Sequence, residues 1–413
     1  MSAPEGDAAA TAEAVARRSY GKLVAFLAAR TRDVAAAEDA LSEAFASALA
    51  DWPRSGIPES PEGWLMTAAK RKLIDRARRA KTKDAAEPQL ALMAEELGEM
   101  DTQDIPDKRL ALMFACAHPA IEESIRAPLI LQTVMGLSAN AIASAFLTSP
   151  AAMAKRLVRA KDKIRDAGIP FEVPGREELA PRLSAVLDAI YATFSEGWSD
   201  PSDFDDVRRD LTGESLFMAQ LVVQLMPLES EALGLAALML HAEARRAARR
   251  DAEGEYVPLA EQDVTRWNIE QISEADILIR RAGGIEGLGR YEVEAALQSA
   301  HALRRLTGRN NWAEIVALYD ALLAMQGSPV VAINRALAIA EIDGPTIALD
   351  ALPHPDSDAR LANYQPYWAA RAELLARWGA AAEAAQAYDL AIGLERDPAV
   401  RTFLLKRKAR LGH

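Results

Sequence analysis

The chain has 413 residues, which is enough for several domains that each bury a core of their own. Half of its residues are hydrophobic, 6% are aromatic and 26% are charged, a composition that is globular and favours helices. The only cysteine, Cys116, excludes an internal disulfide, and no apolar run approaches the roughly 18 residues of a membrane span. We therefore expect a reduced, cytoplasmic protein without a signal peptide or a membrane contact.

The net charge of −12 is unevenly distributed along the chain. Residues 1–170 hold 23 Lys and Arg against 23 Asp and Glu, so the remainder, with 25 against 37, carries the whole acidic excess. The cations of residues 1–170 also gather in two short runs. Because DNA affinity depends on local basic density and not on the total charge, the acidic total does not exclude DNA binding.

The hydrophobic pattern predicts an all-α protein, because helical periodicity runs through most of the chain and no convincing strand pattern interrupts it. Proline, glycine and acidic stretches divide it into segments. The predicted segments are a disordered tail at 1–10, helices at 11–84, an acidic linker at 85–107, helices at 108–172, and two helical stretches at 176–290 and 291–413.

An amphipathic helix is predicted at 36–52 and offers the first candidate binding face. Its large apolar residues are expected to face inward: Leu41, Phe45, Leu49 and Trp52. Its acidic residues are expected to project outward: Glu38, Asp39 and Glu43. An outward acidic face suits a basic protein partner, and a plain solvated face is the alternative.

A strongly basic helix is predicted at 60–83, with Ser60 as its N-cap and Pro61 as its first residue. Residues 70–83 hold eight Lys and Arg against one Asp. The buried face is expected to consist of Leu65, Met66, Ala69, Leu73 and Ala77.

The opposite stripe of this helix combines an aromatic residue with cations. The stripe repeats every seven residues as Trp64, Arg71 and Arg78, with Lys70 and Arg79 beside it. An aromatic ring can stack on an unpaired base while neighbouring cations hold the strand, so we interpret the stripe as DNA-binding. For Trp64 the alternative is a ring that plugs the core at the start of the helix.

A helix-turn-helix is predicted within 127–165. An apolar helix stops at Gly136, Ser138 caps a short helix, and a second helix begins at Ser149 and Pro150. One arc of that last helix is apolar: Met153, Leu157, Ala160 and Ile164. Its other face is basic: Lys155, Arg156, Arg159 and Lys163. A braced basic helix of this kind fits the major groove of DNA, and a solvated basic face is the alternative.

The acidic part of the chain contains a weak internal sequence repeat. Tyr319-Asp320 and Tyr388-Asp389 lie 69 residues apart, close to twice the roughly 34-residue period of tetratricopeptide (TPR) repeats, and an ordinary stack of helical hairpins is the alternative. The segment 245–268 is dense in charge, which indicates either a ligand- or domain-docking loop or a solvated loop with local ion pairs.

Other reactive residues give no case for catalysis. Cys116 and His118 are too few for a metal site, and His241 lies in a helical run without a nucleophile pattern. The glycines of 283–289 follow no strand and are interpreted as a loop. We expect no metal, no cofactor and no enzymatic activity.

These segments together resemble a bacterial sigma factor of the extracytoplasmic-function type. AEDALSEAF (37–45) resembles the region 2 helix that docks on the clamp coiled coil of core RNA polymerase, although Ser42 stands where family members usually have Gln. PEGWLMTAAKRKLIDRARR (61–79) resembles the part of region 2 that melts and reads the minus-ten element. The helix-turn-helix resembles region 4, which reads the minus-thirty-five element.

The rest of the chain resembles the sigma-factor subgroup with a long helical, TPR-like C-terminal extension. The similar stretches are DKRLALMFACAHPAI, DKIRDAGIPFEVP, RRDAEGEYVPLAEQDVTRWN (249–268) and ALPHP (351–355). The resemblance implies region 2 at 11–84, region 4 at 108–172, and control through the extension.

The predicted function is therefore to bind core RNA polymerase through the acidic face of 36–52 and to direct it to a class of promoters through the two basic helices. We also expect the acidic extension to dock on the basic sigma core, because the charge is so unevenly divided. The alternative is a helical-repeat scaffold or ligand-sensing regulator with a DNA-binding front.

Overall fold

The computed structural model describes residues 5–83, 107–146, 148–198, 206–285, 287–355, 358 and 360–412. Within these residues the chain forms α-helices and short 3-10 turns, and the nearest approach to a sheet is one isolated bridge between Arg250 and Tyr256. The predicted all-α class is confirmed. No helix in the described part of the chain is both long and apolar enough to cross a membrane. The linker predicted at 85–107 lies almost entirely outside the described residues.

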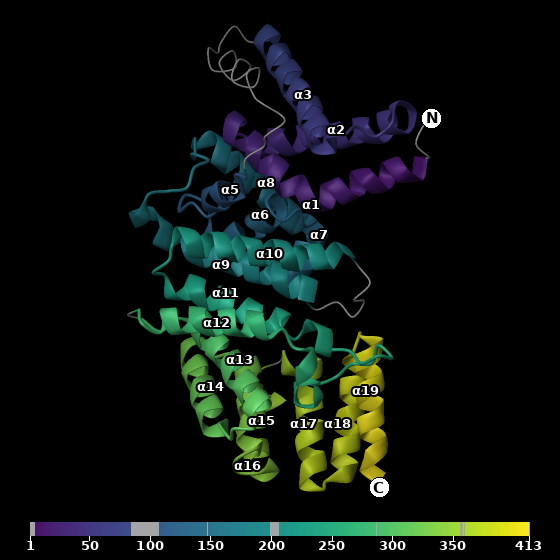
Figure 1. Cartoon of the computed structure of the whole chain (residues 1–413), viewed down its shortest axis with the longest axis vertical. Coiled ribbons are helices and arrows are strands. Elements are labelled where there is room, and N and C mark those ends of the chain that lie inside the picture. Colours follow the sequence, from purple (N-terminus) through teal and green to yellow (C-terminus); the bar gives the residue numbers. More distant parts are fainter. Residues whose placement is uncertain are drawn as a thin grey trace. The chain divides into compact units, whose positions relative to one another are not determined.

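The chain divides into two compact units, the first ending at Leu221 and the second beginning at Val222. The helices of the first unit are α1 (Glu5–Thr31), α2 (Val34–Ser55), α3 (Pro61–Lys83), α5 (Arg109–Cys116), α6 (Glu123–Thr133), α7 (Ala139–Ala145), α8 (Pro150–Asp166), α9 (Arg176–Trp198) and α10 (Asp206–Leu225), the last of which runs across the division (Figure 1).

Helices α1, α2 and α3 pack together around a core that includes Leu41, Trp52 and Met66, all fully buried. The expected inward face of α2 is wrong at Leu49, which is 51% exposed. The buried arc of α2 is centred on its small residues instead, because alanines let neighbouring helices approach closely: Ala37, Ala40, Ala44 and Ala48. The predicted disordered tail at 1–10 also differs, since α1 begins at Glu5 and Ala8 is buried.

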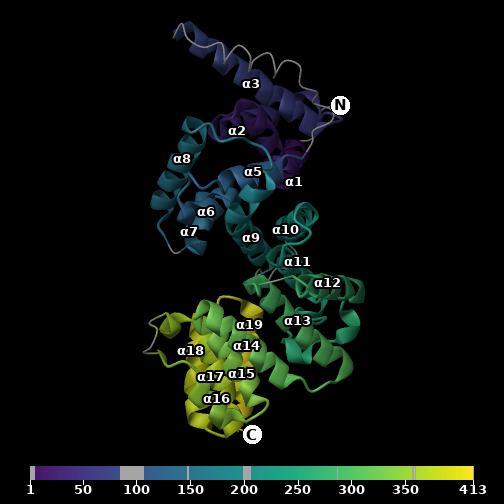
Figure 2. The same cartoon turned by 90° about the vertical axis from the view of Figure 1, so that its left-hand side faces the viewer.

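Helices α6, α7 and α8 form the next group, visible in Figure 2. Gly136 lies in the connection between α6 and α7 and has φ +70°, a left-handed conformation that glycine adopts without strain. Ala141 donates its backbone N–H to the Ser138 hydroxyl at 3.2 Å, and Ala152 donates to Ser149 at 3.3 Å. Both predicted caps are therefore present, and Pro150 opens α8 as expected.

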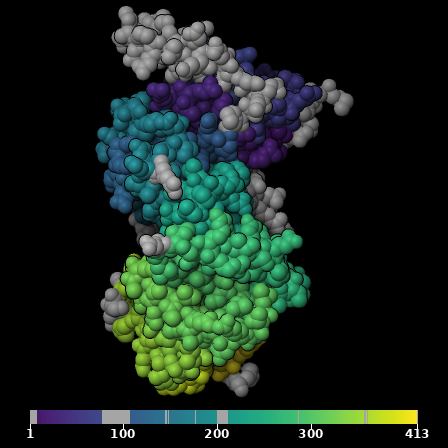
Figure 3. Space-filling view, turned by 60° about the vertical axis from the view of Figure 1, so that its left-hand side comes forward, coloured from purple at the N-terminus to yellow at the C-terminus, as the bar shows by residue number. Residues whose placement is uncertain are grey.

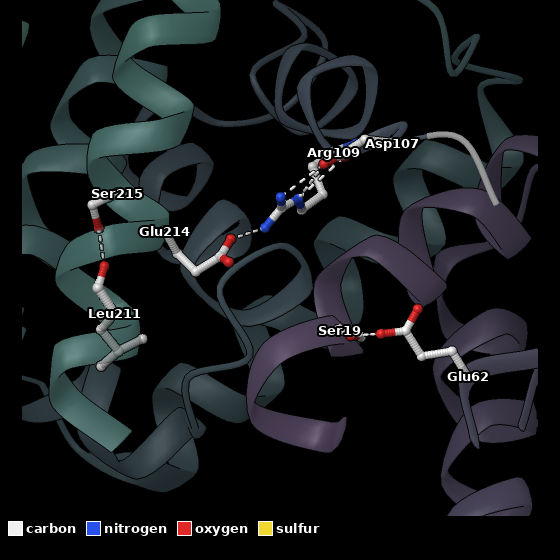
Figure 4. Close-up of polar contacts among 7 residues, drawn as sticks. All are labelled: Ser19, Glu62, Asp107, Arg109, Leu211, Glu214 and Ser215. Carbon is white, nitrogen blue, oxygen red and sulfur yellow. Dashed lines mark hydrogen bonds and ion pairs between the residues drawn. The ribbon is translucent and has the colours of Figure 1, made fainter. Parts of the chain in front are cut away.

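Helix α9 packs against α5 and α6, and α10 contacts α5 through Glu214. Arg182 of α9 is 5% exposed and donates to the Phe114 carbonyl at 3.3 Å. Arg109 of α5 pairs with Asp107 at 2.7 Å and with Glu214 of α10, and Figure 4 shows its guanidinium directed at both carboxylates. These contacts tie α9 and α10 to α5, since the Arg182 and Arg109 side chains are largely buried and each needs its polar partners.

The second unit is built on α11 (Ser230–Glu243), which is buried along nearly its whole length. Its other helices are α12 (Ile269–Ala282), α13 (Arg290–Thr307), α14 (Trp312–Gln326), α15 (Pro329–Ala340), α16 (Pro345–Ala351), α17 (Gln365–Trp378), α18 (Ala381–Leu394) and α19 (Pro398–Ala409). Residues near 300, drawn in green, form a continuous surface on the face shown in Figure 3. Gly234 lets α13 approach α11, since a Cβ there would overlap the backbone of Glu292.

The charged segment 245–268 packs on α19 within the second unit. Arg250 pairs with Asp397 at 2.9 Å, and Tyr256 meets Phe403 edge-to-face with ring centroids 5.5 Å apart. Two further ion pairs join the segment to α19: Glu255 with Lys406, and Glu261 with Arg407. The segment is therefore held on the last helix of its own unit by ion pairs and a ring contact, and the docking of a ligand or a separate domain on it stays a prediction.

Candidate nucleic-acid interface

The start of α3 is fixed by local hydrogen bonds. Gly63 donates its backbone N–H to the Ser60 hydroxyl at 3.3 Å, so Ser60 caps the helix as predicted. Glu62 in the first turn accepts a hydrogen bond from the Ser19 hydroxyl (Figure 4). The Glu62 carboxylate also lies 3.7 Å from the guanidinium of Arg18 of α1. A carboxylate at this end is also favoured by the helix dipole. The expected buried face of α3 is confirmed for its described side chains: Leu65, Met66, Ala69 and Leu73.

Trp64 is half-buried, so its ring packs on the core and is also partly accessible for stacking on a base. Its ring meets the buried ring of Trp52 edge-to-face, with centroids 5.5 Å apart at 70°. Its remaining surface lines two neighbouring grooves together with Ala68 and Arg71, of about 580 Å³ and 380 Å³. The ring is therefore anchored in the core on one side and accessible beside a cation on the other.

The rest of the predicted stripe is less completely described. Arg71 is exposed and Lys70 is half-buried. Arg78 and Arg79 belong to α3, but their side chains lie outside the described residues. The structure therefore brings Trp64 and Arg71 together and leaves the far end of the stripe a prediction.

The larger groove runs between α3 and α2 and carries charges of both signs. Asp39 of α2 pairs with Arg76 of α3 at 3.0 Å, and Glu43 pairs with Lys72 at 3.4 Å. Both acidic side chains are exposed, as expected, but each already has a cationic neighbour. Exposed pairs of this kind contribute about 0–1 kcal/mol each, so a competing partner could separate them at little cost.

Glu38 does not project outward, which corrects the expectation for this residue. Its side chain is only 14% exposed and pairs with Lys161 of α8, which is 10% exposed. Burial raises the pKa of the Glu38 carboxyl, while the Lys161 ammonium acts in the opposite direction. Burial also raises the pKa of the Tyr20 hydroxyl, and the nearby carboxylates of Glu38 and Asp39 raise it further.

Helix α8 separates its side chains into faces as predicted. The apolar arc is buried without exception: Met153, Leu157, Ala160 and Ile164. Three of the predicted DNA-binding cations are exposed and make no ion pair with any described residue: Lys155, Arg159 and Lys163. The fourth, Arg156, lies at the edge and donates to Ser124 at 2.5 Å and to Glu122 at 3.3 Å.

Lys161 is a buried charged residue beside the candidate site that the sequence reasoning missed. It follows Leu157 by four residues and precedes Ile164 by three, so a lysine stands at the edge of an apolar arc. That position is a signal that the side chain has a buried anionic partner, although it does not identify which one.

Cys116 and His118 show no sign of a metal site. The Cys116 thiol lies 3.5 Å from the Thr133 hydroxyl, and burial raises its pKa to about 12. His118 accepts a hydrogen bond from the Ala120 backbone at 3.1 Å through Nδ1. His241 is buried, 3.3 Å from Asp276. Across the described ranges, no group of three or more His, Cys, Asp or Glu side chains could hold a metal ion.

Comparison with known proteins found a family match for the segment that contains α2 and α3, the helices of Glu38 and Trp64. Residues 15–83 match the family model for sigma-70 region 2, and residues 182–283 match a family of unknown function, DUF6596. An uncharacterized protein of Rhizobium meliloti (strain 1021) is 39% identical over 369 residues, which cover 88% of this chain and 87% of the relative. No solved structure matches the chain.

The match over residues 15–83 supports a relation to the sigma factors, which act in transcription initiation with core RNA polymerase and promoter DNA. The chain belongs to the same family as the Rhizobium meliloti protein, since the two correspond over most of both lengths.

Proposed function

We propose that this protein is a sigma factor of the extracytoplasmic-function type, which acts in the cytoplasm and directs core RNA polymerase to a class of promoters. The observation that carries the proposal is the joint presence of Trp64 and Arg71 on accessible grooves inside a segment that matches sigma-70 region 2. An accessible ring beside a cation suits an unpaired base, so this face would engage the melted upstream element.

Helix α8 would read the duplex farther upstream. Its exposed cations lie on the face opposite its buried arc, so the helix can enter a major groove while its apolar side stays covered. Lys155, Arg159 and Lys163 would approach bases and phosphates directly. Arg156 would first have to leave Glu122 and Ser124, at low cost because the Glu122 carboxylate is exposed.

The acidic residues of α2 would bind the polymerase clamp. Asp39 and Glu43 are accessible, and a basic partner could replace Arg76 and Lys72 as their neighbours. That exchange would also release two cations of α3 toward DNA. Glu38 would take part only after its pair with Lys161 is broken.

The residues after α8 would regulate the sigma core as an extension. The support lies at their beginning, where α9 and α10 are tied to α5 through Arg182 and through the Arg109–Glu214 pair. A change in the extension would reach α5 through these buried contacts. We also propose that its acidic surface screens or docks on the basic core, and that its helical hairpins at 291–413 are TPR-like. If deletion of 176–413 left promoter activity unchanged, the regulatory role would be overturned.

Run-off transcription with purified core polymerase tests the main proposal, on a template selected by genome-wide binding of the protein. We expect a promoter-dependent transcript from the wild type and a large loss in the Arg71→Ala and Arg159→Ala variants. Arg165→Ala is the matched control, because Arg165 is exposed on α8 but pairs with Asp162 at 3.0 Å outside the predicted stripe. A wild-type protein that gives no transcript would contradict the proposal.

A further inference from the structure

The end of α11 and the last turns of α13 carry a group of cations that the proposed function does not use. Helix α13 packs along α11, and Arg245 follows the last residue of α11 by two positions. Arg245 is half-buried and donates to the His241 carbonyl at 3.0 Å and to the side-chain carbonyl of Gln298 on α13. Arg304, also half-buried, places its guanidinium 4.3 Å from the centre of the Trp312 ring.

The His301 side chain lies within electrostatic reach of both arginines. It follows Gln298 by three residues on α13, and its ring meets Trp312 edge-to-face with centroids 5.9 Å apart. Burial, together with the charges of Arg245 and Arg304, lowers the pKa of the His301 imidazole to about 4. The imidazole is therefore neutral at neutral pH, and the positive charge of the group comes from its arginines.

These arginines have no acidic partner within the described ranges. Arg245 and Arg304 make no ion pair, and Arg305, the next residue, donates to the Gln262 carbonyl at 2.8 Å. Among the described residues, nothing accepts from the buried Nε atoms of Arg304 and Arg305. Acidic residues of α11, α12, α13 and α14 are engaged by other groups: Glu243 by Arg246, Asp276 by Ser299, Glu294 by Arg290, and Glu314 by Arg309.

Helix dipoles explain only part of this arrangement. The C-terminal end of a helix carries about half a negative charge, so the ends of α11 and α13 favour cations where Arg245, Arg304 and Arg305 stand. Two such ends offset roughly one of the three positive charges. Burial lowers the pKa of Arg245 to about 10, so its guanidinium is still charged at neutral pH. A half-buried charge without a counter-charge is costly, and about two remain here.

We propose that Arg245 and Arg304, together with the His301 imidazole and the Gln298 amide, bind the phosphate group of a small molecule in the second unit. A phosphate dianion would neutralise both guanidiniums, whose planar N–H edges suit its oxygens. Gln298 accepts from Arg245 through its carbonyl, so its amide N–H groups can donate to the phosphate. A neutral imidazole supplies one more N–H. The site does not depend on the proposed function.

The burial of the site favours a small phosphate monoester over a nucleic-acid backbone. A nucleic-acid backbone is held by exposed cations that follow successive phosphates, as the open face of α8 could do. The arginines at the end of α13 are half-buried and surround one histidine. A monoester also brings about two negative charges to a single point at neutral pH, which matches the two uncompensated cations.

Histidine NMR on the full-length protein can test the site directly. The chain has five histidines, and the His301 signal is the one that disappears in the His301→Gln variant. The probes are inorganic phosphate and glycerol phosphate, added to protein in a buffer without other oxyanions. We expect both to shift the His301 signal saturably and to raise the unfolding temperature, because a ligand of the folded state stabilises it.

Two variants remove one cation each: Arg304→Gln and Arg245→Gln. Both should weaken phosphate binding by about tenfold or more, because hydrogen bonds between charged groups are strong. The matched control is Arg309→Gln, since Arg309 is exposed, lies just after α13 and pairs with Glu314, and it should change the affinity by less than about twofold. Circular dichroism verifies the fold, and Arg304→Gln remains informative if Arg245→Gln unfolds.

Several outcomes would overturn the proposal. An unshifted His301 signal at millimolar phosphate would exclude the site, and equal weakening in Arg309→Gln would show an adventitious ion only. Equal affinity for succinate would exclude a phosphate site. Tighter, Arg304-dependent binding of a single-stranded oligonucleotide would exclude a small ligand. In phosphate-free buffer, a clear loss of stability in Arg304→Gln would show that Arg304 only caps α13. None of these results affects promoter-dependent transcription, which tests the proposed function separately.

Discussion

Helices α3 and α8 are both basic, but they hold their cations in opposite ways. The cations of α3 that face α2 already have acidic neighbours, in the pairs Arg76–Asp39 and Lys72–Glu43, and an aromatic ring lies beside them. The cations of α8 at Lys155, Arg159 and Lys163 are exposed and make no ion pair within the described ranges. An open basic face suits the phosphates and base edges of a duplex, whereas a partly neutralised groove with a ring suits a single strand.

The largest effect that would sharpen this comparison comes from the buried side of α8. Leu157→Ala should lower the free energy of unfolding by about 2–5 kcal/mol, because Leu157 is 1% exposed and its truncation leaves a cavity. Urea unfolding measures the loss, and duplex binding should fall with it. Val158→Ala is the neighbouring control, since Val158 is 58% exposed and should change stability by less than about 0.5 kcal/mol. Equal effects at the two sites would mean that the faces of α8 are assigned wrongly.

Arg159→Ala should next cost about 1–3 kcal/mol in binding to the preferred duplex and relax specificity at one base pair, without loss of stability. The reason is that an exposed arginine can donate two hydrogen bonds to a guanine edge. Binding to a panel of single-base variants of the site measures it. A uniform loss across the panel would show that Arg159 only holds phosphate, and α8 would then position the protein without reading sequence at this residue.

Trp64→Ala should weaken binding of single-stranded DNA by roughly 1–2 kcal/mol and leave duplex affinity nearly unchanged, because stacking needs an unpaired base. Fluorescence anisotropy with single- and double-stranded oligonucleotides measures the difference. Trp378→Ala is the matched control, since this ring is 57% exposed in the second unit. If duplex and single-strand affinities fell together, the contrast between α3 and α8 would not hold.

The smallest effect concerns the acidic neighbours of α3. Asp39→Asn should raise DNA affinity of the free protein by less than about 1 kcal/mol, because it separates an exposed pair and leaves Arg76 available to a phosphate. The slope of log affinity against log salt should become steeper by up to about 0.9. An unchanged slope would indicate that Arg76 does not reach DNA. Lys70→Gln, by contrast, should make the slope shallower.

Local features of the sequence predicted the local structure of the interface. Ser149 followed by Pro150 predicts where α8 begins, and the spacing of its apolar residues predicts its buried arc, since both depend only on helix geometry. The same reasoning placed Ser60 and the buried face of α3 correctly. What these predictions share is that the decisive partner lies within a few turns of the same helix.

Features that depend on distant partners could not be predicted in this way. Glu38 was expected outside because acidic residues usually occupy the polar face of an amphipathic helix, but its partner Lys161 is 123 residues away. Leu49 was expected inside because it is large and apolar, but the neighbouring helices pack on the alanine side of α2. Periodicity shows that a helix has two faces, and only tertiary contacts decide how wide the buried one is.

The contacts between residues 245–268 and α19 affect how the second unit unfolds. Helical stacks in which each layer meets only its neighbours can lose structure from one end without disturbing the other. Here Asp397, Phe403, Lys406 and Arg407 return to residues 250–261, so the last helix is fastened to an early segment across about 150 residues of chain. Because these contacts join the last helix to a segment that follows α11, we expect loss of structure at the C-terminus to destabilise residues 250–261 as well, and the unit to unfold more cooperatively than a linear stack.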